Sequence, residues 1–469
     1  MHEAGGAGGI TDDELAAFDR TVAKLRALPA DDPVRLRAEQ VAASFARDGR
    51  LRRRKDRDRN RAAADAATVA ATATGSAARR EDAPLDGPGD PGVFARPRRC
   101  YVCKRPYRRA DAFYHLLCPE CAADNSARRR MRTDLTGRRA LLTGGRVKIG
   151  FQLALMMLRD GAELIVTTRF PHDALRRFEA AEGSGEWLDR LTVVGIDLRD
   201  PRQVIGLCER LRADGRPLDI LVNNAAQTVR RPPEAYAVLA EGERRAAARA
   251  LPAGVLYAPG YRPMAGAPLP QAALAPALPG RDPSAGPDAL PAVDALPAVD
   301  EAGLLPDTAP RNSWSARLGE LDPAEVLETQ LVNALAPALL CDRLLPLLLA
   351  SPHPRRYIVN VTAVEGRFAV RNKTAGHPHT NMAKAALNML TRTSGPELAA
   401  HGVHMCAVDT GWITDENPAP KKARLAGRGF RTPLDVVDGA ARVYDPIVRG
   451  EAGAPVSGVF LKDYREAEW

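Results

Sequence analysis

From residue 139 onward, short apolar runs alternate with segments of helical periodicity, and this alternation limits the fold more than any other feature of the sequence. Six runs have the length and composition of buried strands, namely residues 140–142, 164–166, 191–194, 220–222, 357–359 and 404–408. Segments long enough for helices separate most of them, as in parallel sheets whose crossover helices cover the faces. The pattern predicts an α/β fold with a doubly wound parallel sheet over residues 135–469.

The first strand runs into a glycine-rich turn, since residues 143–150 read TGGRVKIG and a helix is expected from about residue 151. A strand, such a turn and a helix N-terminus form an anion site, because backbone N–H groups and the helix dipole face the pyrophosphate of a dinucleotide. The turn therefore predicts a Rossmann-type cofactor site. The residues of the turn expected to contact the cofactor are Thr143, Gly144, Arg146, Lys148, Ile149 and Gly150.

This turn resembles that of the short-chain dehydrogenase/reductase family, which is written TGxxxGxG. Gly144 and Gly150 fall on the first and last glycines, and Lys148 stands where the middle glycine is expected. A long side chain there meets the closest approach of backbone and pyrophosphate, but Lys148 can turn outward and add a phosphate contact. The resemblance extends over essentially the whole of residues 135–469 and implies an NAD(P)-dependent oxidoreductase.

Arg169, at the end of the second strand, favours NADP(H) over NAD(H) as the cofactor. An acidic residue at this place binds the ribose 2′-hydroxyl of NAD, whereas a guanidinium suits the 2′-phosphate of NADP. The chain reads Thr167-Thr168-Arg169 here and offers no acid. The alternative interpretation is a solvated arginine at a strand end.

Three further motifs match the family's cofactor site in the expected order. Residues 197–198 follow the third strand like its adenine-contacting pair, residues 223–226 (NNAA) match its NNAG motif, and residues 410–414 (TGWIT) stand at its PG turn. The resemblance implies that the last motif holds the nicotinamide carboxamide. The cofactor-binding residues that these motifs imply are Asp197, Leu198, Asn224, Ala225, Gly411, Ile413 and Thr414.

The catalytic set is where the resemblance is incomplete. The family uses a tyrosine to transfer the proton, a lysine to lower its pKa and hold the ribose, a serine to position the carbonyl oxygen, and an asparagine to anchor a water. Asn333 and Lys384 match the asparagine and the lysine. Thr380 stands at the tyrosine position, four residues before Lys384, and Ala363 stands at the serine position.

A threonine hydroxyl does not simply replace a phenol, because its pKa lies several units above the value of about 10 for tyrosine. Two neighbours are candidates: His379, which titrates near neutrality, and Thr362, which precedes the empty serine position. A rearranged set of these two with Asn333 and Lys384 is one hypothesis. The other hypothesis is that His379 and His377 only cap the start of a helix.

Two CxxC pairs predict a metal site in a segment of about residues 100–125. The pairs are separated by fourteen residues, a spacing that suits a structural zinc ion bound by four thiolates. A segment this small depends on the metal to fold, so we expect a small ribbon that braces the next domain or docks a protein. The expected ligands are Cys100, Cys103, Cys118 and Cys121.

The N-terminal region is predicted to be partly helical and partly disordered. Residues 1–61 carry apolar residues at helical spacing over 12–28 and 33–47, and then seven Lys and Arg residues within 52–61. No aromatic side chain interleaves the basic run, which favours a solvated helix end or tail over a contact with nucleic acid. Residues 62–99 are rich in Ala, Pro and Gly, and we expect a disordered linker.

A Pro- and Ala-rich stretch at about residues 230–312 interrupts the α/β pattern. It contains the sequence DALPAV twice in tandem, at 288–293 and 294–299. Compact domains rarely contain unstructured loops of this length, so we expect a disordered insertion on the surface of the domain. It follows a strand end, where it either acts as a lid or is simply tolerated.

Composition predicts a cytoplasmic protein without a membrane segment. The chain lacks a signal-peptide pattern, and its most apolar stretch, residues 335–350, is interrupted by charges and too short to span a bilayer. Four of the seven cysteines cluster and three are scattered, as in reduced compartments. The resemblance implies a homodimer or homotetramer.

Two main hypotheses for the function follow. The first is an NADP(H)-dependent oxidoreductase that acts on an unknown carbonyl or alcohol with a non-standard catalytic set. The second is a catalytically inactive NADP(H)-binding scaffold or sensor that works through protein partners, because the tyrosine is missing. A third, weaker hypothesis is a nucleic-acid-associated factor that uses residues 52–61 and the cysteine segment. The loop at about 414–431, where this fold sets its substrate specificity, has no recognisable chemistry.

Overall fold

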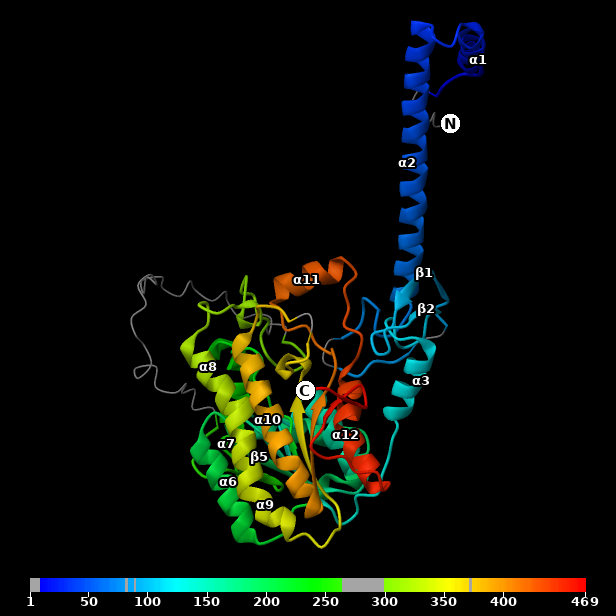
Figure 1. Cartoon of the computed structure of the whole chain (residues 1–469). Helices are drawn as coiled ribbons and strands as arrows, with labels where there is room; N and C mark the ends of the chain where they lie inside the picture. The colour runs from blue at the N-terminus through cyan, green and yellow to red at the C-terminus, as the bar shows by residue number, and fades with distance from the viewer. Residues whose placement is uncertain (1–8, 81–82, 88–89, 264–298, 371–372) are drawn as a thin grey trace, which may run out of the picture. The chain divides into compact units, whose positions relative to one another are not determined.

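The computed structural model of the chain describes residues 9–80, 83–87, 90–263, 299–370 and 373–469 (Figure 1). The chain divides into two compact units, one of Met1–Ala67 with Phe94–Arg96 and one of Thr68–Val93 with Pro97–Trp469. The second unit contains the parallel sheet, the cysteine segment and a large cavity.

Two helices make up most of the first unit, α1 (Asp12–Ala27) and α2 (Pro33–Ala70). Thr11 and Glu14 form a capping box at the start of α1, which satisfies backbone N–H groups that have no partner within the helix. The second expected helix continues through the basic run to Ala70, because arginine and alanine both favour helix. The prediction of a disordered linker is therefore wrong for its first residues.

The rest of the predicted linker also contains ordered backbone. Ala73 and Thr74 are buried, and their backbone N–H groups donate to the carbonyls of Ala112 and Phe113 at 3.1 and 2.9 Å. Strand β1 covers Val93–Arg99. The linker prediction fails because these segments pair with a distant part of the chain, 39 residues on for Thr74 and Phe113, and local composition carries no sign of such pairing.

The cysteine segment is a small α/β structure within the second unit. Strand β1 pairs antiparallel with β2 (Pro106–Arg109), and helix α3 (Pro119–Arg128) follows. Cys118 is the N-cap of α3 and Cys121 lies in its first turn. The two CxxC pairs therefore lie at the loop before β2 and at the start of α3.

Among the described residues, nine strands form one sheet in the order β11-β10-β9-β8-β6-β3-β4-β5-β7. Every neighbouring pair is parallel except β10 with β11. The strands are β3 (Arg139–Thr143), β4 (Glu163–Thr168), β5 (Leu191–Gly195), β6 (Ile220–Asn223), β7 (Val255–Tyr257), β8 (Arg356–Thr362), β9 (Val403–Asp409), β10 (Phe460–Lys462) and β11 (Arg465–Ala467). All six expected strands are present, and the doubly wound α/β fold is confirmed.

Helices cover both faces of this sheet (Figure 1). The main ones are α4 (Lys148–Arg159), α5 (Pro171–Glu179), α6 (Pro201–Asp214), α9 (Ala336–Leu349), α10 (Pro378–Ala400) and α12 (Val436–Glu451). A further helix, α11 (Ala419–Gly427), buries none of its residues. Helices α4, α5 and α12 bury Leu153, Phe178 and Tyr444 in one apolar core. Helices α6 and α9 bury Val204 and Leu344 in a second core. Because both faces are covered, the parallel strands read as continuous apolar runs.

The interruption at about 230–312 is not unstructured throughout, so this prediction is wrong for its first part, before residue 264. Helix α7 covers Ala237–Ala247, and β7 extends the sheet by pairing parallel with β5. The carboxylate of Glu243 in α7 is buried and accepts hydrogen bonds from the backbone N–H groups of His172 and Asp173. Such hydrogen bonds to distant residues stabilise a helix even where the local sequence has a weak helix propensity. Residues 264–298, with nearly all of the tandem repeat, lie outside the described residues.

The helical run Pro323–Leu349 is, within the described ranges, the one segment that is long and apolar enough to cross a membrane by length and composition. It consists of α8 (Pro323–Gln330), a π-helical turn (Leu331–Leu335) and α9. Half of its most apolar window is buried within the protein. Leu340 and Leu344 of α9 belong to the core on α6, as expected for a core helix.

Candidate active site

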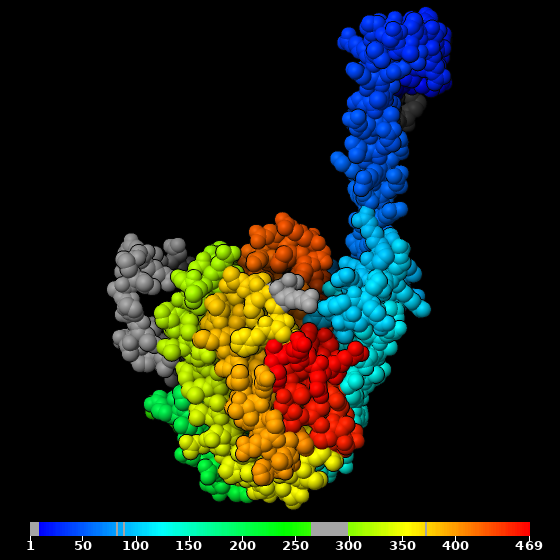
Figure 2. Space-filling view, in the orientation of Figure 1, coloured from blue at the N-terminus to red at the C-terminus, as the bar shows by residue number. Residues whose placement is uncertain are grey.

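The carboxyl ends of the strands border a cavity of about 1240 Å³. This is the edge where open α/β sheets bind their ligands, and the volume exceeds the roughly 300–1,000 Å³ of common ligand pockets. Helix α11 contributes Lys421 to its wall and projects at the upper end of this unit in the space-filling view (Figure 2). The predicted site residues that line the cavity are Gly144, Arg146, Lys148, Ile149, Gly150, Arg169, Asp197, Leu198, Asn224, Ala225, Thr362, Thr380, Lys384, Gly411, Ile413 and Thr414. Thr143, Asn333 and His379 do not line it.

Tight backbone contacts fix the glycine-rich turn. Gly144 has a φ of +72°, and a Cβ on Gly150 would lie 2.1 Å from the carbonyl oxygen of Gly144. The hydroxyl of Thr143 accepts hydrogen bonds from the backbone N–H groups of Asn224 and Ala225, both at 3.0 Å. The Asn224 amide donates to the carbonyls of Thr143 and Gly144 at 3.1 Å each. Thr143, which lies behind the cavity wall, therefore joins the carboxyl ends of β3 and β6.

Lys148 takes up the left-handed conformation that its glycine-like position requires, with a φ of +56°. It is the first residue of α4 and lines the cavity. Glu416 lies opposite: burial raises the pKa of its carboxyl, but the Lys148 charge and a 2.7 Å hydrogen bond from the Thr414 hydroxyl together hold it below its usual range. A cation thus lines the cavity at the N-terminus of α4, near the Glu416 carboxylate.

The guanidinium of Arg169 lies against two aromatic rings. Its central carbon is 4.8 Å from the ring centroid of Tyr236 and 5.5 Å from that of Phe170, and Nη2 donates to the Tyr236 hydroxyl at 3.3 Å. No carboxylate pairs with it among the described residues. Tyr236 lies in the stretch predicted to be unstructured, and sequence reasoning missed it.

The other predicted charges at this end are already paired. Arg146 is buried and donates to the carboxylate of Asp173 at 2.6 Å and to the carbonyl of Ala302 at 2.8 Å. Burial raises the pKa of Asp197, but hydrogen bonds from Arg199 at 2.6–3.0 Å keep it below its usual range. Arg169 therefore differs from Arg146 and Arg199, which line the same cavity but donate to carboxylates.

Lys384 lies in α10 with its ammonium inside the cavity wall. Its Nζ donates to the carbonyl of Val361 at 2.9 Å, and burial lowers its pKa to about 8. One turn earlier in the helix, Thr380 lines the cavity, and its hydroxyl oxygen is buried without a hydrogen-bond partner in the part of the chain that the structure describes. Thr362 lines the cavity as well, and its hydroxyl reaches the carbonyl of Lys384 at 3.5 Å.

Asn333 lies in the π-helical turn between α8 and α9 and is buried. Its side-chain oxygen accepts from the backbone N–H of Gln227 at 2.7 Å, and its Nδ2 donates to the carbonyl of Gln227 at 2.9 Å. Gln227 lines the cavity just after the motif at 223–226. The asparagine therefore fixes the cavity wall and does not reach the cavity itself.

Two family models match most of the α/β domain. The family model described as short chain dehydrogenase matches residues 138–240, and the one described as Enoyl-(Acyl carrier protein) reductase matches residues 298–426. The two matches follow each other on either side of the interruption. The chain belongs to the short-chain dehydrogenase/reductase family.

Individual relatives cover different shares of the chain. An uncharacterized protein of Acanthamoeba polyphaga mimivirus is 31% identical over 363 residues, which are 75% of this chain and 71% of that protein. A probable oxidoreductase of Streptomyces antibioticus is 41% identical over 95 residues, 20% of this chain and 30% of that protein. A short chain dehydrogenase of Burkholderia cenocepacia, solved in complex with NADP, is 21% identical with a TM-score of 0.44 and covers 70% of this chain and 97% of that one.

His379 does not occupy the place that the rearranged catalytic set requires for this dehydrogenase/reductase. Its side chain is 1% exposed, and neither ring nitrogen has a hydrogen-bond partner among the described residues. Burial lowers its pKa, so the ring is neutral near pH 7. His379 thus lies outside the cavity wall, and its part in the rearranged catalytic set stays a prediction.

The capping hypothesis is wrong. His377 is the N-cap of α10, but its side chain makes no capping hydrogen bond. Its ring stacks on Trp314 with centroids 4.0 Å apart, and its Nδ1 lies 2.8 Å from the carbonyl of Trp314. Trp314 lines the cavity, so His377 supports the cavity wall.

Two further cavity residues escaped the sequence analysis, Tyr101 and Lys462. The Tyr101 hydroxyl accepts a hydrogen bond from the backbone N–H of Trp412 at 3.0 Å. Lys462, at the end of β10, lies 3.7 Å from Asp409 and 3.4 Å from Asp463. Burial lowers the pKa of Lys462, but these two carboxylates outweigh it and raise the pKa to about 12. The sequence does not place either residue at the cavity: Tyr101 lies within the first CxxC pair, 311 positions before its partner Trp412.

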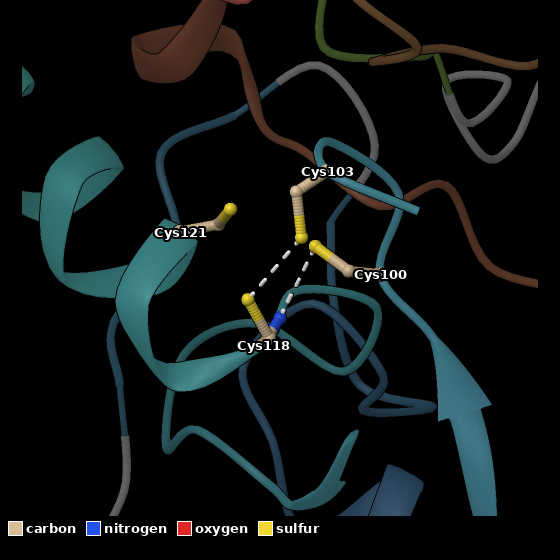
Figure 3. Close-up of side chains that lie close together, drawn as sticks. All are labelled: Cys100, Cys103, Cys118 and Cys121. Atoms are coloured by element: carbon tan, nitrogen blue, oxygen red, sulfur yellow. Dashed lines mark hydrogen bonds between the residues drawn. The ribbon is translucent and has the colours of Figure 1, made fainter. Parts of the chain in front are cut away.

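The four cysteines of the CxxC pairs converge on one point (Figure 3). Their sulfur atoms all lie within 4.8 Å of one another, and Cys103 Sγ is 3.7 Å from Cys118 Sγ. Tetrahedral zinc with Zn–S bonds of about 2.3 Å separates its sulfurs by about 3.8 Å. The backbone N–H of Cys118 points at Cys100 Sγ at 3.3 Å, an arrangement that stabilises a thiolate. The cluster therefore has the ligands and spacing of a structural zinc site.

Proposed function

We propose that this protein is an NADP(H)-dependent oxidoreductase that interconverts a carbonyl compound and its alcohol with a non-standard catalytic set. The observation that carries the proposal is the cavity itself. It combines the glycine-rich turn, the Arg169 guanidinium and the buried Lys384 ammonium with Thr380, whose hydroxyl has no hydrogen-bond partner among the described residues.

The residues present fit a dinucleotide. A Cβ at Gly150 would collide with the Gly144 carbonyl, so the turn packs closely on the start of α4, and both line the cavity where a pyrophosphate would meet the helix N-terminus. Arg169 suits the 2′-phosphate of NADP(H), and Lys148 a pyrophosphate oxygen. The proposed cofactor contacts also include Ile413 and Thr414 near the nicotinamide, and Lys384 at the ribose. When bound, NADP(H) supplies or accepts the hydride.

Lys384 is the proposed proton donor for carbonyl reduction. A group with a pKa near the working pH is the most effective general acid, and burial brings the pKa of Lys384 to about 8. Thr380 is one helical turn before it, on the same face, so its hydroxyl can hold the carbonyl oxygen beside the ammonium. Thr362 supports the Lys384 backbone from β8. This division of roles replaces the single tyrosine of the family.

The alternative is a catalytically inactive NADP(H)-binding scaffold or sensor. Ala363 at the serine position and Thr380 at the tyrosine position favour it, because two hydroxyl groups of the usual set are replaced. The same cofactor contacts serve both functions. Turnover therefore distinguishes them.

The cysteine segment is proposed to bind a structural zinc ion through Cys100, Cys103, Cys118 and Cys121. Metal analysis of the purified chain is expected to give one zinc per polypeptide. The double substitution Cys100→Ser and Cys103→Ser should abolish zinc binding. The control Cys208→Ser, outside the segment, should leave the zinc content unchanged.

The first test of the main proposal is a fluorescence titration with NADPH and NADH, followed by a panel of aldehydes and ketones. Tight NADPH binding with turnover on any member supports the oxidoreductase. Tight binding without turnover on a wide panel supports the scaffold. Failure to bind either nucleotide contradicts both.

A further inference from the structure

Tyr101 connects the cysteine segment to the cavity. It lies between the cysteines of the first CxxC pair, and its backbone N–H donates to the carbonyl of Leu116 at 2.7 Å, close to the second pair. Its phenol leaves the segment and lines the cavity. One residue therefore has its backbone among the proposed metal ligands and its side chain in the proposed active site.

The phenol holds one particular turn of the cavity. Its hydroxyl accepts the backbone N–H of Trp412, directly before Ile413, the proposed nicotinamide contact. On the other side, Gly411 has a φ of +83° and donates its N–H to the Asp409 carboxylate at 2.5 Å. A Cβ at Gly411 would lie 2.5 Å from Leu434 and 3.6 Å from the Tyr101 hydroxyl, so the turn is closely packed. The phenol thus fixes the backbone that presents Ile413.

The cysteine segment is held firmly against the α/β domain by buried polar contacts. The Tyr114 hydroxyl donates to the carboxylate of Asp438 at 2.6 Å, and Arg442 donates to the side chain of Asn125 at 2.9 Å. All four residues are buried. These contacts hold the segment against the α/β domain in two places. The position of Tyr101 is therefore set by the folded conformation of its loop.

We infer that the cysteine segment is part of the active site: Tyr101 positions the turn at 410–414 for the nicotinamide, and the metal held by the four cysteines supports cofactor binding through it. This inference rests on the proposed function, since it presupposes that NADP(H) binds in the cavity. Tyr101 is a positioning residue, because its hydroxyl acts on the turn through the Trp412 N–H.

The test compares Tyr101→Phe with Tyr107→Phe in the full zinc-loaded chain. Tyr107 is in the same segment, but its hydroxyl donates to the carbonyl of His115 at 2.7 Å, away from the cavity lining. Two ligands are titrated, NADPH and 2′,5′-ADP, which has the adenine end without the nicotinamide. Losing one hydrogen bond to the turn is expected to weaken NADPH binding about fivefold in Tyr101→Phe. Binding of 2′,5′-ADP should stay within about twofold, and Tyr107→Phe should match wild type for both ligands.

Two further measurements complete the experiment: the fluorescence emission of bound NADPH, and nucleotide binding after zinc removal. The emission of bound NADPH reports on the surroundings of the nicotinamide, and we expect it to change in Tyr101→Phe and not in Tyr107→Phe. Removing zinc with a chelator should likewise weaken NADPH binding more than 2′,5′-ADP binding. Unchanged NADPH affinity and emission in Tyr101→Phe, or an equal loss for both ligands, would overturn the inference. A wild-type chain that binds neither ligand would instead remove the proposed function on which it rests.

Discussion

The two ends of the cavity use their charged and polar groups differently. At the adenine and pyrophosphate end, Arg146 is paired with Asp173 and Asp197 with Arg199. At the nicotinamide end, Lys384 has only a carbonyl as its hydrogen-bond partner, and the Thr380 hydroxyl has none among the described residues. Buried polar groups without partners cost free energy, so they are expected where a ligand completes the set. On this contrast rests our proposal that the first end holds the cofactor and the second carries the reaction.

The largest effect should come from Lys384→Ala, which tests the reactive end. Loss of the general acid is expected to lower kcat/KM for carbonyl reduction by about 100-fold or more. Steady-state kinetics with saturating NADPH measure it, with Lys421→Ala, another lysine of the cavity wall, as the control within about twofold of wild type. The affinity for 2′,5′-ADP should be unchanged, and its loss would contradict the separation of the two ends.

Arg169→Ala tests the binding end. Charge-assisted hydrogen bonds contribute about 1.5–3 kcal/mol, so the preference for NADPH over NADH should fall by about 10- to 100-fold. Titration calorimetry with both nucleotides measures this ratio, and NADH affinity should stay the same. Arg202→Ala, whose side chain is exposed and paired with Asp200, is the matched control. A parallel loss of NADPH and NADH binding would assign Arg169 a structural role instead.

The pH dependence of carbonyl reduction sharpens the assignment of Lys384. Burial lowers the pKa of this ammonium to about 8, so the proton is present below that pH and is lost above it. The kcat/KM for reduction should be flat below about pH 7 and fall about tenfold per pH unit above pH 8. The reverse oxidation should rise over the same range. A profile governed by a group near pH 6 would point to a different acid.

The smallest effect is expected for His379→Leu. The imidazole is buried and lacks hydrogen-bond partners within the described residues, so an apolar side chain of similar size is neutral or stabilising there. We expect kcat/KM within about twofold of wild type and a melting temperature that is equal or higher. A tenfold loss of kcat/KM in a stably folded variant would return His379 to the catalytic set.

The fold and the binding end could be predicted because both depend on residues that are close together in the sequence. The glycine-rich turn follows β3 directly and Arg169 follows β4 directly, so an apolar run and the next few residues locate each of them. Parallel strands bring their carboxyl ends to one edge, which places these residues together without knowledge of the packing. The predicted contacts themselves await the nucleotide experiments.

The reactive end depends on tertiary geometry that the sequence does not display. His379 and Thr380 are neighbours, yet successive helical residues point about 100° apart, and only Thr380 lines the cavity. Tyr101 and Tyr236 arrive from segments outside any family motif. The predictions of a disordered linker and insertion fail for the same reason, since the hydrogen bonds that order residues 73–74 and 237–247 come from distant segments.

The left-handed conformation of Lys148 has a consequence for laboratory evolution of this protein. A residue with a Cβ costs about 1 kcal/mol more than glycine at such a φ, so this position gives up some thermal resistance. The same residue adds a cation at the pyrophosphate end. Libraries selected only for survival at high temperature should therefore converge on glycine at position 148, and libraries selected for turnover at scarce nucleotide should retain lysine.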